Sequence, residues 1–142
     1  KEFKSKFIIN FLSKFSKKEL KSKSNEFVNI YESHLKLSAL SYIKNLQKHS
    51  ENEVVIVSAS LDLWIKPISK KLNINSITTI SKFKSDYFDG ISGENCWGDE
   101  KVLRIKKLYN PKNYKTIYAY GDSKGDFAML NLAHVRKYKF FN

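Results

Sequence analysis

Two carboxylates stand four residues apart where an apolar segment ends, in the stretch YAYGDSKGDF at residues 118–127. Asp122 directly follows a strand-like run, and Asp126 comes about one helical turn later. A carboxylate at a strand end is a hard oxygen ligand, and Mg²⁺ takes one or two of these together with water and phosphate. Asp126 is close enough in sequence to orient Asp122 or to join the outer shell of the metal. We therefore interpret Asp122 and Asp126 as candidate Mg²⁺ residues.

Two further segments carry groups that suit phosphate. Ser58 follows an apolar run and offers a hydroxyl, and the amides from Ala59 onward open an expected helix whose N-terminus attracts anions. Lys101 stands at the start of another expected helix and could neutralise phosphoryl charge. Each residue also has an ordinary role, since Asp and Ser cap helices and Lys is commonly a solvated charge. Their combination is what indicates phosphate chemistry.

The elements that must position these groups alternate between strands and helices. The sequence predicts strands near residues 54–57, 77–80, 116–120 and 135–140, and helices near 61–72, 100–109 and 125–133. This order predicts an α/β fold, a Rossmann-like parallel sheet with helices on both faces. Ligands of such sheets bind beyond the carboxyl ends of the strands. Ser58, Lys101 and Asp122 should therefore meet at one edge.

Three local features refine this expectation. Pro67, inside an expected helix, predicts a kink or a late helix start. Asp89-Gly90 indicates the turn of a hairpin over residues 81–92. Residues 1–50 have a helical pattern, with a phenylalanine every four residues (Phe3, Phe7, Phe11, Phe15) and a capping box from Ser16 to Glu19. The change of pattern near residue 50 separates these helices from the α/β part.

Three stretches resemble the second, third and fourth motifs of the haloacid dehalogenase (HAD) superfamily, in its phosphoserine phosphatase-like branch. They are VVIVSASLDLWIKPISKKL, NCWGDEKVLRIKKLY and IYAYGDSKGDFAML. The resemblance implies a Mg²⁺-dependent phosphatase that hydrolyses a phosphomonoester through an aspartyl-phosphate. It implies that Ser58, Ala59 and Lys101 bind the phosphoryl group, with Ser58 and Lys101 catalytic, and that Asp122, supported by Asp126, binds Mg²⁺.

The motif that would supply the nucleophile is absent from this sequence. The family's reaction needs a DxDxT motif at the end of the first, central strand, and no two of the six aspartates are two residues apart. Without that strand, two halves of a parallel sheet would face a gap. We therefore expect the chain to be the C-terminal part of a longer protein, with residues 1–36 forming part of a helical cap and 37–142 an α/β core lacking its first strand. An omitted segment and a rearranged fold are the alternatives.

Composition limits the remaining possibilities. A net charge of +12 suits phosphorylated substrates, nucleic acid or acidic lipid, but a lysine-rich surface explains it equally. A single cysteine, Cys96, excludes an internal disulfide and fits a reducing cytoplasm; we interpret it as a packed thiol. No run of about 18 apolar residues predicts a membrane-spanning helix.

Residues 1–23 contain eight lysines and two glutamates, and with the phenylalanines they could form a peripheral contact with anionic lipid. In the alternative interpretation, the phenylalanines pack inside the cap and the lysines are solvated.

Two further functions compete with the phosphatase. One is a catalytically inactive HAD-like binding or regulatory domain, which the missing DxD favours if the chain is complete. The other is a basic nucleic-acid-binding module, which would bind with steep salt dependence and without Asp122. We expect a phosphorylated small-molecule or lipid substrate and no nucleic-acid partner. We expect a cytoplasmic location, and a peripheral location at the membrane is the alternative.

Overall fold

The structure is a computed structural model, and it describes residues 8–31 and 34–141. Residues 8–12 are helical. The elements that follow are α2 (Lys17–Tyr31), α3 (Leu37–Leu46), β1 (Val55–Leu61), α4 (Asp62–Lys71), β2 (Asn75–Lys84), β3 (Tyr87–Ser92), α5 (Asp99–Leu108), β4 (Tyr118–Gly121), α6 (Phe127–Leu132) and β5 (Val135–Tyr138), with short 3-10 helices η2 (Pro111–Asn113) and η3 (Lys124–Asp126). The predicted α/β class with parallel strand pairs and flanking helices is confirmed.

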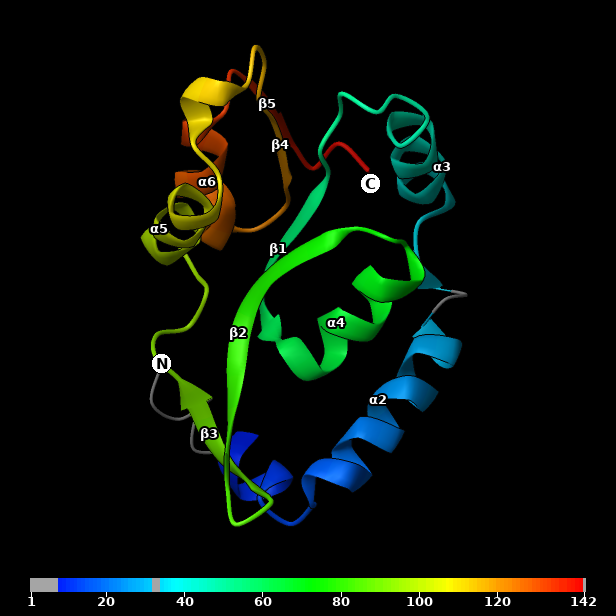
Figure 1. Cartoon of the computed structure of the whole chain (residues 1–142), viewed down its shortest axis with the longest axis vertical. Helices are drawn as coiled ribbons and strands as arrows, with labels where there is room; N and C mark the ends of the chain where they lie inside the picture. Colours follow the sequence, from blue (N-terminus) through cyan, green and yellow to red (C-terminus); the bar gives the residue numbers. More distant parts are fainter. Residues whose placement is uncertain (1–7, 32–33, 142) are drawn as a thin grey trace.

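The strands form two separate sheets. β1 pairs with β2 in parallel and β2 pairs with β3 antiparallel, while β4 pairs only with β5, in parallel. Within the described residues no strand joins β1 to β4. In Figure 1, α5 and α6 lie on one side of β4 and β5, and α3 lies on the other side, near the C-terminus. The parallel sheet that the sequence predicts is therefore present as two halves.

Two predicted boundaries were wrong. The first strand does not end at Val57 but runs on to Leu61, with a register shift between Ser58 and Leu61 that keeps the last residue paired with β2. The hairpin turns at Ser85 and Asp86, whose φ angles are 47° and 70°. Asp89-Gly90 lies inside β3 instead. Two adjacent residues with positive φ match the right-handed twist of the hairpin strands, and a polar Ser-Asp pair tolerates that geometry.

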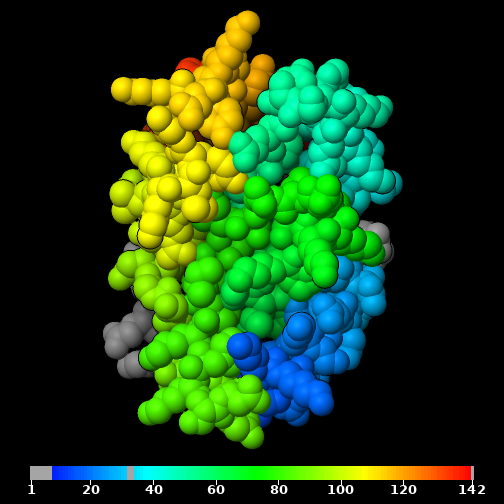
Figure 2. All heavy atoms as spheres, viewed as in Figure 1, coloured from blue at the N-terminus to red at the C-terminus, as the bar shows by residue number. Residues whose placement is uncertain are grey.

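Pro67 neither ends nor delays α4, which runs from Asp62 to Lys71. A proline has no N–H, so the carbonyl four residues earlier, at Leu63, cannot receive its usual helical hydrogen bond. The hydroxyl of Ser24, on α2, donates to the Leu63 carbonyl instead. Ser24 is buried, and α2 packs along α4 (Figures 1 and 2). The proline thus leaves the Leu63 carbonyl of α4 free to accept a hydrogen bond from α2.

Replacing Ser24 by Ala should lower the free energy of unfolding by about 1–3 kcal/mol, because the Leu63 carbonyl loses its donor inside a helix contact. Urea unfolding measures the change. Ser22→Ala is the matched control, since Ser22 is exposed and its hydroxyl lies 3.4 Å from Glu26 Oε1. The control should change stability by about 0.5 kcal/mol or less. Equal losses in the two variants would refute the role of Ser24.

The predicted capping box at the start of α2 is confirmed. Ser16 N donates to Glu19 Oε2 at 2.8 Å, and Glu19 N donates to Ser16 Oγ at 3.2 Å. Of the four phenylalanines, Phe3 and Phe7 lie outside the described residues. One buried cluster joins residues of the N-terminal segment to the α/β part: Leu12, Leu20, Leu61 and Phe88. A second buried cluster lies under α6: Ala119, Leu130 and Ala133.

The division into a cap portion (1–36) and a core (37–142) stays a prediction. Among the helices that the structure describes, none combines the length and the apolar character needed to cross a bilayer.

Candidate functional site

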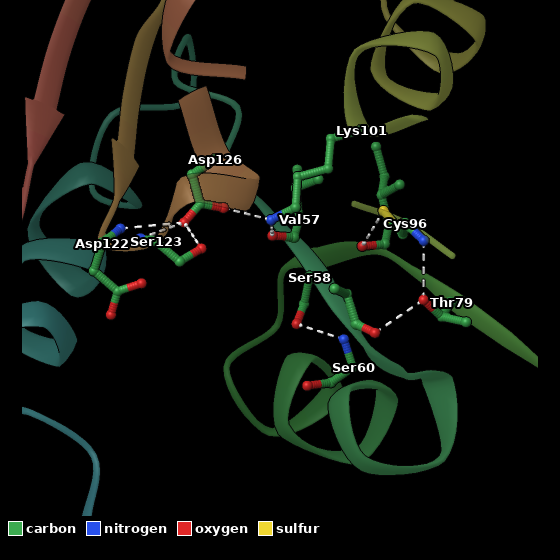
Figure 3. Close-up of polar contacts among 11 residues, drawn as sticks. Val57, Ser58, Ser60, Thr79, Cys96, Lys101, Asp122, Ser123 and Asp126 are labelled. Atoms are coloured by element: carbon green, nitrogen blue, oxygen red, sulfur yellow. Dashed lines mark hydrogen bonds and ion pairs between the residues drawn. The ribbon is translucent and has the colours of Figure 1, made fainter. Parts of the chain in front are cut away.

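Lys101 lies in the first turn of α5, and only 4% of its surface is exposed. Gly98, the residue before the helix, has a φ of 62° and turns the chain into it. The Lys101 ammonium donates to the Val57 carbonyl of β1 at 3.0 Å and to Asp126 Oδ1 at 2.6 Å (Figure 3). Lys101 is therefore not a solvated surface charge, because it links β1 to the short helix η3 that follows β4.

Asp126 is also buried, with 6% of its surface exposed. Its Oδ2 accepts from Asp122 N at 3.2 Å, from Ser123 N at 3.0 Å and from Ser123 Oγ at 2.7 Å. Burial alone would raise the pKa of Asp126, but the hydrogen bonds from Lys101 and Ser123 outweigh it and hold that pKa below its ordinary value. Both carboxylate oxygens are engaged, so Asp126 fixes the loop around Asp122 and holds Lys101.

Asp122 is placed differently from Asp126. It is exposed, and in Figure 3 its carboxylate points away from Asp126 and from Lys101. The described residues offer that carboxylate no hydrogen-bond or ion-pair partner. An exposed carboxylate without a partner fits the hard oxygen ligand that Mg²⁺ requires. Within the described part of the chain there is no group of three His, Cys, Asp or Glu that could hold a metal ion. Asp122 would thus be one ligand among others from elsewhere.

Ser58 sits at the irregular end of β1. Its Oγ accepts from Ser60 N at 3.1 Å. The next carbonyl, at Ala59, lies 2.9 Å from the hydroxyl of Thr79 on β2, and that hydroxyl accepts from Cys96 N at 3.0 Å. The buried Thr79 thus links the last part of β1 to β2 and to the segment before α5. No motif in the sequence indicated this network.

A single cleft of about 1030 Å³ brings the predicted residues together. The lining includes all of the predicted site residues: Ser58, Ala59, Lys101, Asp122 and Asp126. The same cleft runs between the end of β1 and the end of β4, where no strand among residues 8–31 and 34–141 joins the two sheets. Hydroxyl, ammonium and carboxylate groups facing one cavity can bind a phosphoryl group and a divalent cation.

Comparison with known proteins decides the family. Residues 3–131 match the family model of haloacid dehalogenase-like hydrolases. The chain belongs to this family. Protein CicA of Caulobacter vibrioides (strain NA1000 / CB15N) is 34% identical over 92 residues, which are 63% of this chain and 41% of CicA. The superfamily that the three motifs resemble is thus confirmed.

Two solved structures share the fold. A protein with unknown function from Bordetella pertussis Tohama I has a TM-score of 0.82 at 20% identity, over 91% of this chain and 61% of that one. A phosphoserine phosphohydrolase-like protein from Francisella tularensis subsp. tularensis SCHU S4 has a TM-score of 0.63 at 21% identity, over 87% and 56%. The chain therefore spans less than two thirds of the length of each relative.

Sequence reasoning missed the arginine that holds α5, the helix of Lys101, against β2 in this member of the HAD family. Arg104, one turn further along α5, donates to the Thr78 carbonyl at 2.6 Å and to the Glu94 carbonyl at 2.6 Å, and pairs with Glu100 at 2.7 Å. These contacts clamp α5 to β2. Arg104 stands three residues after Lys101, on the same face of the helix, and this spacing could have indicated that the two residues face the same neighbours.

The site of this HAD hydrolase does not include the cysteine. Cys96 is fully buried, and that burial raises the pKa of its thiol. A thiol with a raised pKa stays protonated and is a poor nucleophile. The interpretation of Cys96 as a packed side chain agrees with this placement.

Proposed function

We propose that the intact protein is a Mg²⁺-dependent phosphatase that hydrolyses a phosphomonoester through an aspartyl-phosphate, with the nucleophile supplied by a segment outside this chain. The observation that carries this proposal is that Ser58, Lys101 and Asp122 line one cleft. Membership of a hydrolase family supports the general reaction class.

The residues of this chain have distinct tasks in the proposal. The Ser58 hydroxyl donates to a phosphoryl oxygen. An ammonium group has three donors, and Lys101 uses two of them on Val57 and Asp126. The third stays available for the phosphoryl group, whose charge Lys101 offsets. Asp122 would hold Mg²⁺, which supplies charge stabilisation of the transferring phosphoryl group when bound. Asp126 pairs with the Lys101 ammonium and holds it in place.

The sheet supports a nucleophile from outside the chain. In the described residues β1 and β4 each have a pairing partner on one side only, and the cleft lies between them. An unpaired, buried backbone group costs about 1–3 kcal/mol, so an additional strand in this place would stabilise both halves. Such a strand would end at the same edge as Ser58 and Asp122, where an aspartate could attack the phosphoryl group.

The second candidate is a binding or regulatory domain on the same scaffold. It is favoured by the fact that Asp126 alone satisfies the charge of Lys101, so the pair is stable without a reacting carboxylate. It predicts that phosphate compounds bind but that no phosphate is released.

The experiment compares both candidates in the intact protein, including the segment that precedes this chain. Released inorganic phosphate is measured with p-nitrophenyl phosphate, with Mg²⁺ and with excess chelator. We expect activity with Mg²⁺ only, and a loss of about 100-fold or more in Asp122→Asn. Asp89→Asn is the control, because Asp89 is an exposed partner of Lys82 at 3.0 Å outside the cleft. Full activity in Asp122→Asn would contradict the proposal, and binding without release would support the regulatory domain.

The partners and the location belong to the same proposal. We infer a phosphorylated small-molecule or lipid substrate, no nucleic-acid partner, and a cytoplasmic protein for which residues 1–23 allow a peripheral membrane contact. The cleft supports the first part, because it collects the phosphate-binding groups in a cavity instead of an open surface.

A further inference from the structure

The cleft has an apolar wall in addition to its polar end. Residues 8–12 contribute Ile9 and Phe11, α4 contributes Trp64, and β3 contributes Ile91. Ile9 and Phe11 are 37% and 57% exposed, and both line the cleft that also holds the phosphate-binding groups. These four side chains are called the apolar wall below.

Packing fixes the wall in place. Leu12, next to Phe11, is buried in the cluster that includes Leu61 and Phe88. Ile9 rests on β3 at a glycine, since a Cβ added to Gly90 would lie 3.4 Å from Ile9 Cδ1. The Ile9 side chain therefore lies directly against the backbone of β3 at this position. The exposed part of the wall is therefore presented by a segment anchored on both sides.

Charge is confined to other parts of the cleft. Its charged lining residues are Lys36, Glu94, Lys101, Asp122, Asp126 and Lys139. None of them belongs to residues 8–12, to α4 or to β3. Lys101 and Asp126 pair with each other, and Asp122 stands with the phosphate-binding groups. A ligand that fits the whole cleft is thus anionic at one end and apolar at the other.

We propose that the alcohol part of the substrate carries an extended apolar group, an alkyl chain or a ring, and that the apolar wall determines this specificity. The inference rests on the proposed phosphatase function. A small, doubly charged alcohol such as that of phosphoserine would place an ammonium and a carboxylate against apolar side chains without partners, at a considerable desolvation cost. An apolar chain would instead cover Ile9 and Phe11, which line the same cleft as the phosphate-binding groups.

The test uses the intact protein with ethyl, butyl, hexyl and octyl phosphate and with O-phosphoserine, each below its aggregation concentration. We expect kcat/KM to rise roughly two- to fourfold for each added methylene up to hexyl or octyl. Phe11→Asn and Ile9→Asn should flatten this rise, so that the ratio of kcat/KM between octyl and ethyl phosphate falls toward one. Leu103→Asn is the matched control, because Leu103 is 63% exposed on α5 and does not line the cleft. Its chain-length profile should equal that of the wild type.

The outcomes separate the two proposals. Equal kcat/KM along the series, or O-phosphoserine as the best substrate, overturns the role of the wall and leaves the phosphatase intact. If no compound is hydrolysed, the phosphatase proposal fails. Calorimetric binding of ethyl- and octylphosphonate then decides on the wall alone. Tighter binding of octylphosphonate that Phe11→Asn abolishes supports it, and equal affinities refute it.

Discussion

Replacing Asp126 by Asn should lower the free energy of unfolding by about 3–5 kcal/mol, because it leaves a buried ammonium without its partner. The side chains of Lys101 and Asp126 are only 5% and 9% exposed, and their charged atoms are 2.6 Å apart. The acceptors left to Lys101 would both be neutral, namely the Val57 carbonyl and the oxygen of the new amide. Urea unfolding of the intact protein measures the loss.

Asp89→Asn again provides the comparison, since it removes an ion pair with Lys82 in which both side chains are exposed. Exposed pairs of this kind contribute about 0–1 kcal/mol. Losses of the same size in the two variants would show that the buried pair does not hold the sheets together.

The stabilising effect of Asp126 should also depend on pH. Its pKa in the folded protein lies below the ordinary value of 3.8, so the folded state favours the charged form. The stability that this shift contributes is fully present above pH 3.8 and is lost as the pH falls through the lowered pKa. The difference between wild type and Asp126→Asn should therefore shrink in strong acid. A difference that stays constant down to about pH 2 would contradict the ion pair.

The second large effect is expected at Gly121, where β4 ends. A Cβ at this position would lie 2.5 Å from Asp126 Cβ, which is closer than non-bonded carbons approach. Because Asp126 is tied to Lys101, it cannot move away without breaking the ion pair. Gly121→Ala should therefore lower stability by about 1–3 kcal/mol and displace the loop that carries Asp122. A misplacement of about 1 Å at a catalytic group costs on the order of 100-fold in activity.

Gly93→Asn is the control for Gly121→Ala. Gly93 has a φ of 72° and open space around its Cα, and asparagine tolerates that backbone better than other side chains. It should cost about 1 kcal/mol or less and leave phosphate release unchanged. Urea unfolding and the p-nitrophenyl phosphate assay check both variants. Normal activity in Gly121→Ala would show that the Asp126 loop tolerates displacement.

The sequence predicted the meeting of Ser58, Lys101 and Asp122 because strand order places the carboxyl ends of parallel strands at one edge. Apolar runs such as residues 54–57 allowed the strands to be located in the sequence. The role of Asp126 was not predictable in the same way, because spacing alone cannot distinguish an outer-shell carboxylate from one buried against a lysine. The structure shows that Asp126 is the second kind, because Lys101 is buried beside it. No periodic pattern in the sequence indicated that Lys101 would be buried.

Other differences arise from contacts distant in sequence. Pro67 breaks a helical hydrogen bond, and only the tertiary contact with Ser24 compensates for it. The hairpin turns at Ser85-Asp86, although Asp89-Gly90 is the stronger local turn pattern, and this register places Phe88 in the buried cluster. Neither the contact of Ser24 with α4 nor the burial of Phe88 can be predicted from local sequence propensity.

A crystal structure of the intact protein with Mg²⁺ and tungstate, an analogue of phosphate, tests the central claim most directly. We expect the cation in contact with an Asp122 carboxylate oxygen, and the oxyanion within hydrogen-bond distance of Ser58 Oγ and Lys101 Nζ. We also expect a carboxylate from outside this chain on the opposite side of the oxyanion. Tungstate bound elsewhere, or Asp122 without contact to the cation, would contradict it.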